Sequence, residues 1–195
     1  MSPVSHLDDV GTALLRAADH LLATEGPASL TVRRIATDAG VSTMNVYSRF
    51  GGKDGVVEQL FIHGFHLLAQ YMNEVATTDD PLADLRGCGQ AYRRFATEHE
   101  TFYAVMFERV VADYVPTEPA LAIAKHTLEL LAARLDRAMD AGLVRRMDPI
   151  HAAAIVWSTC HGAVSLQLKH VADEPVDWSA VFTDATEAVV RGLAP

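Results

Sequence analysis

Residues 31–53 read TVRRIATDAGVSTMNVYSRFGGK, a pattern typical of two short helices joined by a tight turn and followed by a basic start to a third helix. Thr31 is placed to cap the first helix, whose apolar residues, such as Ile35, recur at helical spacing. Gly40 stands where the chain must turn sharply, in a backbone conformation that costs glycine little. Ser42 is placed to cap the second helix. We therefore expect a helix-turn-helix over this stretch.

The second of these helices would bury Val46 and Phe50 and turn its remaining side chains outward. In a helix-turn-helix the first helix braces against the phosphate backbone and the second enters the major groove. The outward positions are Thr43, Met44, Asn45, Tyr47, Ser48 and Arg49. The alternative is an ordinary helical hairpin of a larger bundle, but a hairpin has no need for Tyr47, Arg49 and Lys53 together on its outside.

Several residues of fixed type at fixed spacing carry a family resemblance, and they are Thr31, Ile35, Ala36, Ala39-Gly40-Val41-Ser42, Val46-Tyr47, Phe50 and Lys53. The stretch resembles the DNA-binding segment of TetR-family transcriptional regulators, over roughly residues 10–60. The resemblance implies an all-α fold with an N-terminal three-helix DNA-binding domain (residues 1–54) and a C-terminal helical ligand-binding and dimerisation domain (residues 55–195). The chain departs from the family pattern at Met44 and Asn45, and again at Gly51-Gly52 and Gly55-Val56-Val57, which we expect to loosen the run into the next helix.

The side-chain chemistry and the resemblance together assign roles on DNA. The resemblance implies that Tyr47 and Lys53 hold phosphates, and we expect Thr31 and Arg33 to touch the backbone where the bracing helix begins. The residues expected to face base edges or nearby phosphates are Thr43, Met44, Asn45 and Arg49, with Ser42 beside them. Asn suits adenine, Arg suits guanine, and Met can contact a thymine methyl group. Because Met44 and Asn45 depart from the family pattern, the operator cannot be inherited from relatives.

The composition of the 195-residue chain limits the class of protein. Half of the residues are hydrophobic, so a core can be buried, and the net charge of −9 at first argues against nucleic acid. However, residues 31–53 carry four basic side chains against Asp38 alone, and phosphate contact depends on the field within a Debye length. Two cysteines far apart fit a reducing compartment. We find no signal-peptide pattern and no membrane span, which predicts a cytoplasmic protein.

Apolar periodicity predicts helices along the rest of the chain and no strand. Asp8 or Asp9 is placed to cap a first helix that ends at Gly26-Pro27 and covers the back of the helix-turn-helix. Asp54 is placed to cap a long helix. The remaining predicted helices cover about residues 54–77, 82–98, 99–110, 118–141, 149–171 and 177–192, with a break at Asp173–Pro175.

The last two predicted helices, 149–171 and 177–192, form a candidate dimer interface. The first is apolar on much of its circumference and rich in small residues, which let helices approach closely. Two such helices from each subunit would form a four-helix bundle around a two-fold axis, as the TetR resemblance implies. A homodimer would place two reading helices about 34–36 Å apart on a palindromic operator of double-stranded DNA. The alternative is that both helices are core of a monomer.

Two aromatic groups are candidates for an effector pocket. They are Phe102, Tyr103, Met106 and Phe107 in one segment and Trp157 with His161 in another, where a Trp…His-Gly pattern resembles one TetR subgroup. Apolar walls with few polar anchors suit a small molecule, and plain core packing is the alternative. His63 and His66 lack further ligands by spacing, so we predict no metal site, and we predict no cofactor.

Three classes of function are compatible with the sequence. The first is a DNA-binding regulator, expected to be a repressor released from its operator by a small molecule. The second is a helical small-molecule-binding protein with a vestigial helix-turn-helix. A helical enzyme is the third and least favoured, because the sequence has no nucleophile elbow, paired-carboxylate motif or phosphate loop, and we predict no catalytic residue.

Overall fold

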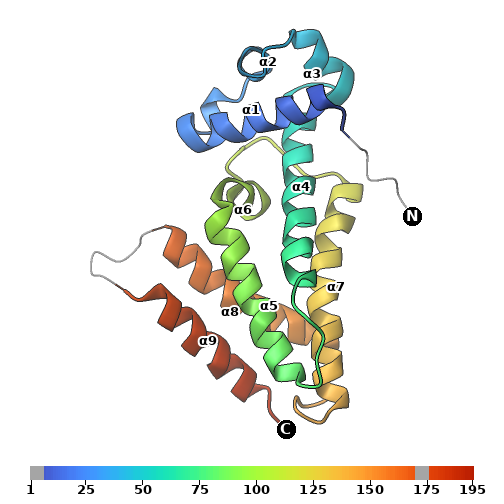
Figure 1. Ribbon diagram of the computed structural model, residues 1–195, viewed down its shortest axis with the longest axis vertical. Helices are drawn as coiled ribbons and strands as arrows, with labels where there is room; N and C mark the ends of the chain where they lie inside the picture. Colours follow the sequence, from blue (N-terminus) through green and yellow to red (C-terminus); the bar gives the residue numbers. More distant parts are fainter. Residues whose placement is uncertain (1–6, 170–175) are drawn as a thin grey trace. The chain divides into compact units, whose positions relative to one another are not determined.

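A computed structural model describes residues 7–169 and 176–195, and within them every regular element is a helix (Figure 1). The elements are α1 (Asp9–Glu25), the short 3₁₀ helix η1 (Pro27–Ser29), α2 (Val32–Asp38), α3 (Thr43–Phe50), α4 (Lys53–Asn73), α5 (Pro81–Glu98), α6 (Glu100–Phe107), α7 (Glu118–Asp140), α8 (Pro149–Leu168) and α9 (Trp178–Gly192). The all-α prediction is confirmed. The chain divides into two packed units: the chain up to Gly64 with Thr101–Leu121, and Phe65–Glu100 with Ala122–Pro195.

In the first unit, α1 covers the helix-turn-helix. Its apolar positions are buried as the periodicity predicts, and Leu14, Ala18 and Leu21 have no exposed surface. Helix α1 contacts both α2 and α3, and Figure 1 shows it lying against them. The three helices therefore form the small unit that the sequence predicts.

Side-chain caps fix where these helices begin. Asp8 caps α1 by accepting a hydrogen bond from the backbone N–H of Gly11, and Thr31 caps α2 by accepting one from Arg34. Gly40 makes the turn with a φ of 69°, a region that glycine enters without a steric penalty. Each of these three sequence predictions is confirmed.

The start and end of the long helix differ from the prediction. Helix α4 begins at Lys53, so Asp54 lies inside its first turn rather than capping it, and the helix ends at Asn73 rather than near residue 77. The cause of the early start is the end of α3. Gly51 adopts a left-handed conformation and donates its N–H to the Tyr47 carbonyl, so that only Gly51 and Gly52 separate the two helices.

The boundaries of the later helices follow the prediction with small changes. Asp148 caps α8 and Asp177 caps α9. Helix α6 is shorter than the predicted 99–110 and ends at Phe107. Helix α8 ends at Leu168, while residues 170–171 of the predicted helix and the predicted break at Asp173–Pro175 lie outside the described residues.

The core of the second unit lies among α5, α8 and α9. Helix α8 packs along α9 and against α5, and Figure 1 shows α8 and α9 side by side. Phe95 on α5, Val164 on α8 and Phe182 on α9 are almost fully buried. Cys88 and Cys160 are buried in the same unit and both are free thiols.

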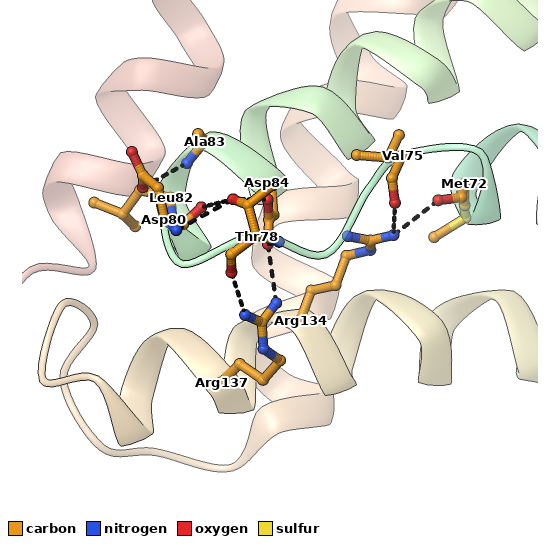
Figure 2. A network of polar contacts seen from close by, with 9 residues as sticks. All are labelled: Met72, Val75, Thr78, Asp80, Leu82, Ala83, Asp84, Arg134 and Arg137. Atoms are coloured by element: carbon orange, nitrogen blue, oxygen red, sulfur yellow. Dashed lines mark hydrogen bonds and ion pairs between the residues drawn. The ribbon is translucent and has the colours of Figure 1, made fainter.

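Two arginines of α7 hold the loop between α4 and α5 (Figure 2). Arg134 donates from one nitrogen to the carbonyls of Met72 and Val75, at 2.9 Å each. The Met72 carbonyl belongs to the last turn of α4, where carbonyls have no partner within the helix, so Arg134 supplies the missing donor. Arg137 donates to the carbonyl of Thr78 at 2.7 Å, in the loop that follows the end of α4 at Asn73.

The carboxylate of Asp84 anchors the same loop and is only 3 % exposed. It accepts hydrogen bonds from the Thr78 backbone N–H at 2.9 Å, from the Thr78 hydroxyl at 2.7 Å and from Arg137 at 2.9 Å. The bonds from Thr78 and then the Arg137 guanidinium lower the pKa of Asp84 to about 2. Because its charge is fully paired, this buried carboxylate ties α5 to α7 and to the preceding loop.

Candidate nucleic-acid interface and effector site

Helix α3 presents an exposed face above a single buried anchor. Val46 has no exposed surface, whereas Met44 is 70 % exposed and Tyr47 is 55 % exposed. The predicted DNA-binding residues all lie in the first unit: Thr31 and Arg33 at the start of α2, Ser42 just before α3, Thr43, Met44, Asn45, Tyr47 and Arg49 on α3, and Lys53 at the start of α4. Their assignment to DNA contact stays a prediction.

Three of these residues are joined by hydrogen bonds along α3. Arg49 donates to the Asn45 side-chain oxygen at 2.8 Å, and the Asn45 amide nitrogen donates to the Ser42 hydroxyl at 3.1 Å. Ser42 occupies the N-cap position of α3, but its side chain makes no hydrogen bond to the backbone of the helix. The sequence prediction of a side-chain cap there is wrong, because the hydroxyl accepts from Asn45 instead.

Arg49 also makes a long-range ion pair that the sequence reading missed. Its guanidinium reaches the carboxylate of Asp8, with Nε 2.9 Å from Oδ1 and Nη2 2.6 Å from Oδ2. The hydrogen bond from Arg49 and then that from the Gly11 N–H lower the pKa of Asp8 to about 2. Sequence reasoning identified Asp8 only as a helix cap, because no local pattern links positions 41 residues apart.

The other basic residues of the stretch differ in their surroundings. Arg34 is paired with Glu25 of α1 at 2.5 Å, so part of its charge is compensated. Arg33 lies exposed on α2, and Lys53 is half-buried at the start of α4. Because Asp8 and Glu25 partly neutralise Arg49 and Arg34, we expect Arg33 and Lys53 to contribute most to the positive electrostatic potential at this surface.

Gly55 sets how α4 follows α3. A Cβ atom at this position would lie 1.8 Å from the carbonyl oxygen of Phe50 and 2.8 Å from its carbonyl carbon, both backbone atoms that cannot rotate away. The residue that the sequence reading took as a loosening of the helix start is therefore required by a close backbone approach. It fixes Lys53 relative to the end of α3.

The aromatic residues of α6 pack within the first unit. Tyr103 is fully buried, Met106 is 8 % exposed, and the ring of Phe102 lies 5.2 Å from that of His63 on α4. The rings of Tyr103 and Phe107 are 5.1 Å apart. A Cβ atom on Gly64 would come within 2.5 Å of the Met106 sulfur, so α6 lies close against α4.

The two residues predicted on α8 form a polar aromatic group in the second unit. The rings of Trp157 and His161 are 5.6 Å apart, as expected for residues four apart on one helix. His161 Nδ1 lies 3.0 Å from the hydroxyl of Tyr92 on α5, where Tyr92 is buried and His161 is half-buried. The six residues predicted to line one pocket thus belong to both units, four in the first and two in the second, and their joint role stays a prediction.

Among the residues that the structure describes, no group of three or more His, Cys, Asp or Glu side chains is arranged to hold a metal ion. Within the same part of the chain, no helix is both long enough and apolar enough to span a bilayer.

Comparison with known proteins identifies the family. Residues 14–60 match the family of bacterial regulatory proteins named tetR, and residues 85–189 match the tetracyclin repressor-like C-terminal domain. An uncharacterized HTH-type transcriptional regulator of Mycobacterium tuberculosis, Rv0681, is 25 % identical over 184 residues, covering 93 % of this chain and 80 % of that protein. The HTH-type transcriptional repressor KstR2 of the same species is 34 % identical over 97 residues, which span 49 % of this chain and 48 % of that protein.

A solved structure shares the fold as well. The SmeT–triclosan complex matches with a TM-score of 0.70 at 21 % identity, covering 96 % of this chain and 93 % of that one. An all-helical chain that begins with a three-helix reading unit and continues into a helical C-terminal domain is the architecture of a helix-turn-helix regulator. The chain belongs to the TetR family of DNA-binding transcriptional regulators.

Proposed function

We propose that this protein is a homodimeric repressor that binds a palindromic operator through α3 and is released by a small molecule. The observation that carries the proposal is the exposed face of α3, where polar and cationic side chains surround Met44 and Tyr47 over a buried Val46. A helix that only packed in a bundle would gain nothing from leaving these side chains in water. The name of KstR2, a repressor, supports repression as the mode of action.

We assign two kinds of DNA contact, to phosphates and to base edges. Tyr47, Lys53, Thr31 and Arg33 hold phosphates, which fixes the position of the protein without reading sequence. Thr43, Met44 and Asn45 face the base edges. We place this reading function in residues 1–54 and effector binding with dimerisation in residues 55–195, in the cytoplasm, where the chromosomal operator lies.

We assign dimerisation to α8 and α9. Exposed apolar side chains on these helices support the assignment: Ile150 is 40 % exposed, Leu166 is 46 % exposed and Val181 is 38 % exposed. Pairing two copies would remove such surface from water, which is favourable by roughly 25 cal/mol per Å² of apolar area. Sedimentation of Leu166→Glu and Val181→Glu tests it, since a charge in the interface is expected to shift the protein toward monomer.

We assign effector binding to the C-terminal domain, with His161 as a polar anchor. The support is the aromatic group of Trp157, His161 and Tyr92, which combines apolar rings with a hydrogen-bonding imidazole. SmeT, which shares the fold, has been solved with triclosan. A compound that dissociates the wild-type protein from operator DNA, but leaves His161→Ala bound, would support this assignment. Equal dissociation of both proteins would contradict it.

Selection of bound duplexes from a random pool tests the DNA-reading function. We expect a palindromic motif with half-sites about one helical turn apart. Tyr47→Phe and Lys53→Ala should weaken binding to all sequences alike, while Asn45→Ala should change base preference. A wild type that recovers no motif and retains DNA only weakly at low salt would instead favour a small-molecule-binding protein with a vestigial helix-turn-helix.

A further inference from the structure

The guanidinium of Arg49 on α3 is already occupied. Two of its nitrogens face the two carboxylate oxygens of Asp8, and a third faces the Asn45 side-chain oxygen. The arginine side chain is only 27 % exposed in this arrangement, whereas Asp8 is 57 % exposed. An arginine that is to grip a phosphate must first leave this carboxylate.

Asn45 is oriented by the same contacts. Arginine can only donate hydrogen bonds, so the atom of Asn45 that faces Arg49 must be the amide oxygen. The amide nitrogen then points to the Ser42 hydroxyl. Each amide atom keeps capacity for a second hydrogen bond, and one acceptor beside one donor is the pattern that recognises the N6 and N7 atoms of adenine.

The helix cap does not account for the whole role of Asp8. Capping uses one oxygen, Oδ1, which accepts from Gly11 N at 2.7 Å. The other oxygen, Oδ2, receives Arg49 Nη2 at 2.6 Å. The carboxylate therefore serves two structures, the start of α1 and the reading helix, and asparagine could replace it in the first role alone.

We propose that Asp8 is a specificity-determining positioning residue. It keeps Arg49 off the DNA phosphates and, through Arg49, holds the Asn45 amide in the orientation that reads adenine. This inference rests on the proposed DNA-reading function and adds to it a residue outside the helix-turn-helix. It also assigns Arg49 to orientation of a neighbour instead of direct contact.

The test compares Asp8→Asn with Asp9→Asn by duplex selection and by binding at several salt concentrations. Both substitutions remove one negative charge at adjacent exposed positions, but only the first releases Arg49. For Asp8→Asn we expect the preference at the adenine position of each half-site to fall about tenfold. We also expect the plot of the logarithm of the DNA-binding constant against the logarithm of salt concentration to become steeper by about 0.9 for each arginine released. Asp9→Asn should keep the wild-type base preference and slope.

Two further variants keep the proposal testable if Asp8→Asn folds poorly. Arg49→Gln should relax the same base position without lowering the salt slope, because Arg49 touches no phosphate in the wild type. In an Asn45→Ala background, Asp8→Asn should change base preference no further, since it acts through Asn45.

The outcomes separate this inference from the function on which it rests. A wild type that selects no motif overturns the proposed DNA reading and this inference with it. A wild type that selects a motif which Asp8→Asn leaves unchanged overturns the inference alone. A salt slope that falls by about 0.9 per subunit in Arg49→Gln also overturns it, because Arg49 would then be a phosphate contact.

Discussion

Two arginine–aspartate pairs show how one chemical contact serves different ends in the two units. Arg49 and Asp8 join α3 to the start of α1, and Arg137 and Asp84 join α7 to α5. Both carboxylates have a pKa lowered to about 2. Their surroundings differ, because Asp8 is 57 % exposed and Asp84 is 3 % exposed.

The difference in exposure separates function from stability. An exposed ion pair adds little to folding, because water and salt already screen both charges. Its partners are therefore free to be exchanged, as a DNA-reading surface requires. A buried carboxylate that loses its partner keeps the full cost of desolvation, so the pair in the second unit must stay closed for the loop to hold.

The largest effect is expected from breaking the buried pair. Arg137→Met leaves the Asp84 charge without its cation and removes the donor to the Thr78 carbonyl, so we expect the thermal unfolding midpoint to fall by about 5–10 °C. Arg146→Met is the matched control, because Arg146 is 63 % exposed and its partners Asp136 and Asp140 are exposed carboxylates. Thermal unfolding followed by circular dichroism measures both midpoints, and equal midpoints would show that burial of Asp84 does not make its ion pair more important for stability.

Acid should reveal the same contrast through Asp84→Asn. The folded pKa of Asp84, about 2, lies below the unfolded value, so its stabilisation is complete above about pH 4 and is lost as pH falls toward about 2. We expect the difference in unfolding midpoint between wild type and Asp84→Asn to be largest at neutral pH and to shrink over that window. Thermal scans from pH 7 to pH 2 measure it, and a difference that is constant with pH would show that the charge of Asp84 contributes nothing.

Salt should act on the exposed pair more than on the buried pair. Raising NaCl from about 0.1 M to about 1 M shortens the Debye length from about 10 Å to about 3 Å. We expect the small midpoint difference between wild type and Asp8→Asn to vanish at high salt, while Arg137→Met keeps most of its deficit. If both deficits shrank by the same fraction, the difference in burial would not govern the two pairs.

The smallest effect on stability is expected from Arg49→Gln. Because its partner Asp8 is exposed, we expect the unfolding midpoint to move by no more than about 2 °C, even though base preference changes. Differential scanning calorimetry beside duplex selection separates the two readouts. A loss of many degrees would mean that Arg49 holds the first unit together and is no positioning device.

Local pattern was sufficient to predict the helices and the reading unit. The periodicity of Leu14, Ala18 and Leu21, the cap at Thr31 and the turn at Gly40 each depend on residues within one or two helical turns, and each is confirmed. The family comparison confirms the all-α fold class and the class of DNA-binding regulator that residues 31–53 indicate.

Contacts between distant residues were beyond that reach. The pairing of Asp8 with Arg49, and that of Arg137 with Asp84, joins positions 41 and 53 residues apart, and hydrophobic periodicity carries no record of either. The clash that excludes a side chain at Gly55 comes from a backbone approach, which composition does not encode. Ser42 is a different case, because its partner Asn45 is only three residues away, and a cap pattern does not tell a hydroxyl bonded to a neighbouring side chain from one bonded to the helix backbone.

The two buried cysteines make the opening of the second unit measurable by the rate at which their thiols are alkylated. Burial raises the pKa of the Cys88 thiol to about 11 and that of Cys160 to about 12, and alkylating reagents attack the thiolate. Iodoacetamide should therefore label these positions only when the packing of α5 and α8 opens. A compound that binds and stabilises this unit would slow the labelling. Libraries could thus be screened for effectors by mass spectrometry before any operator sequence is known.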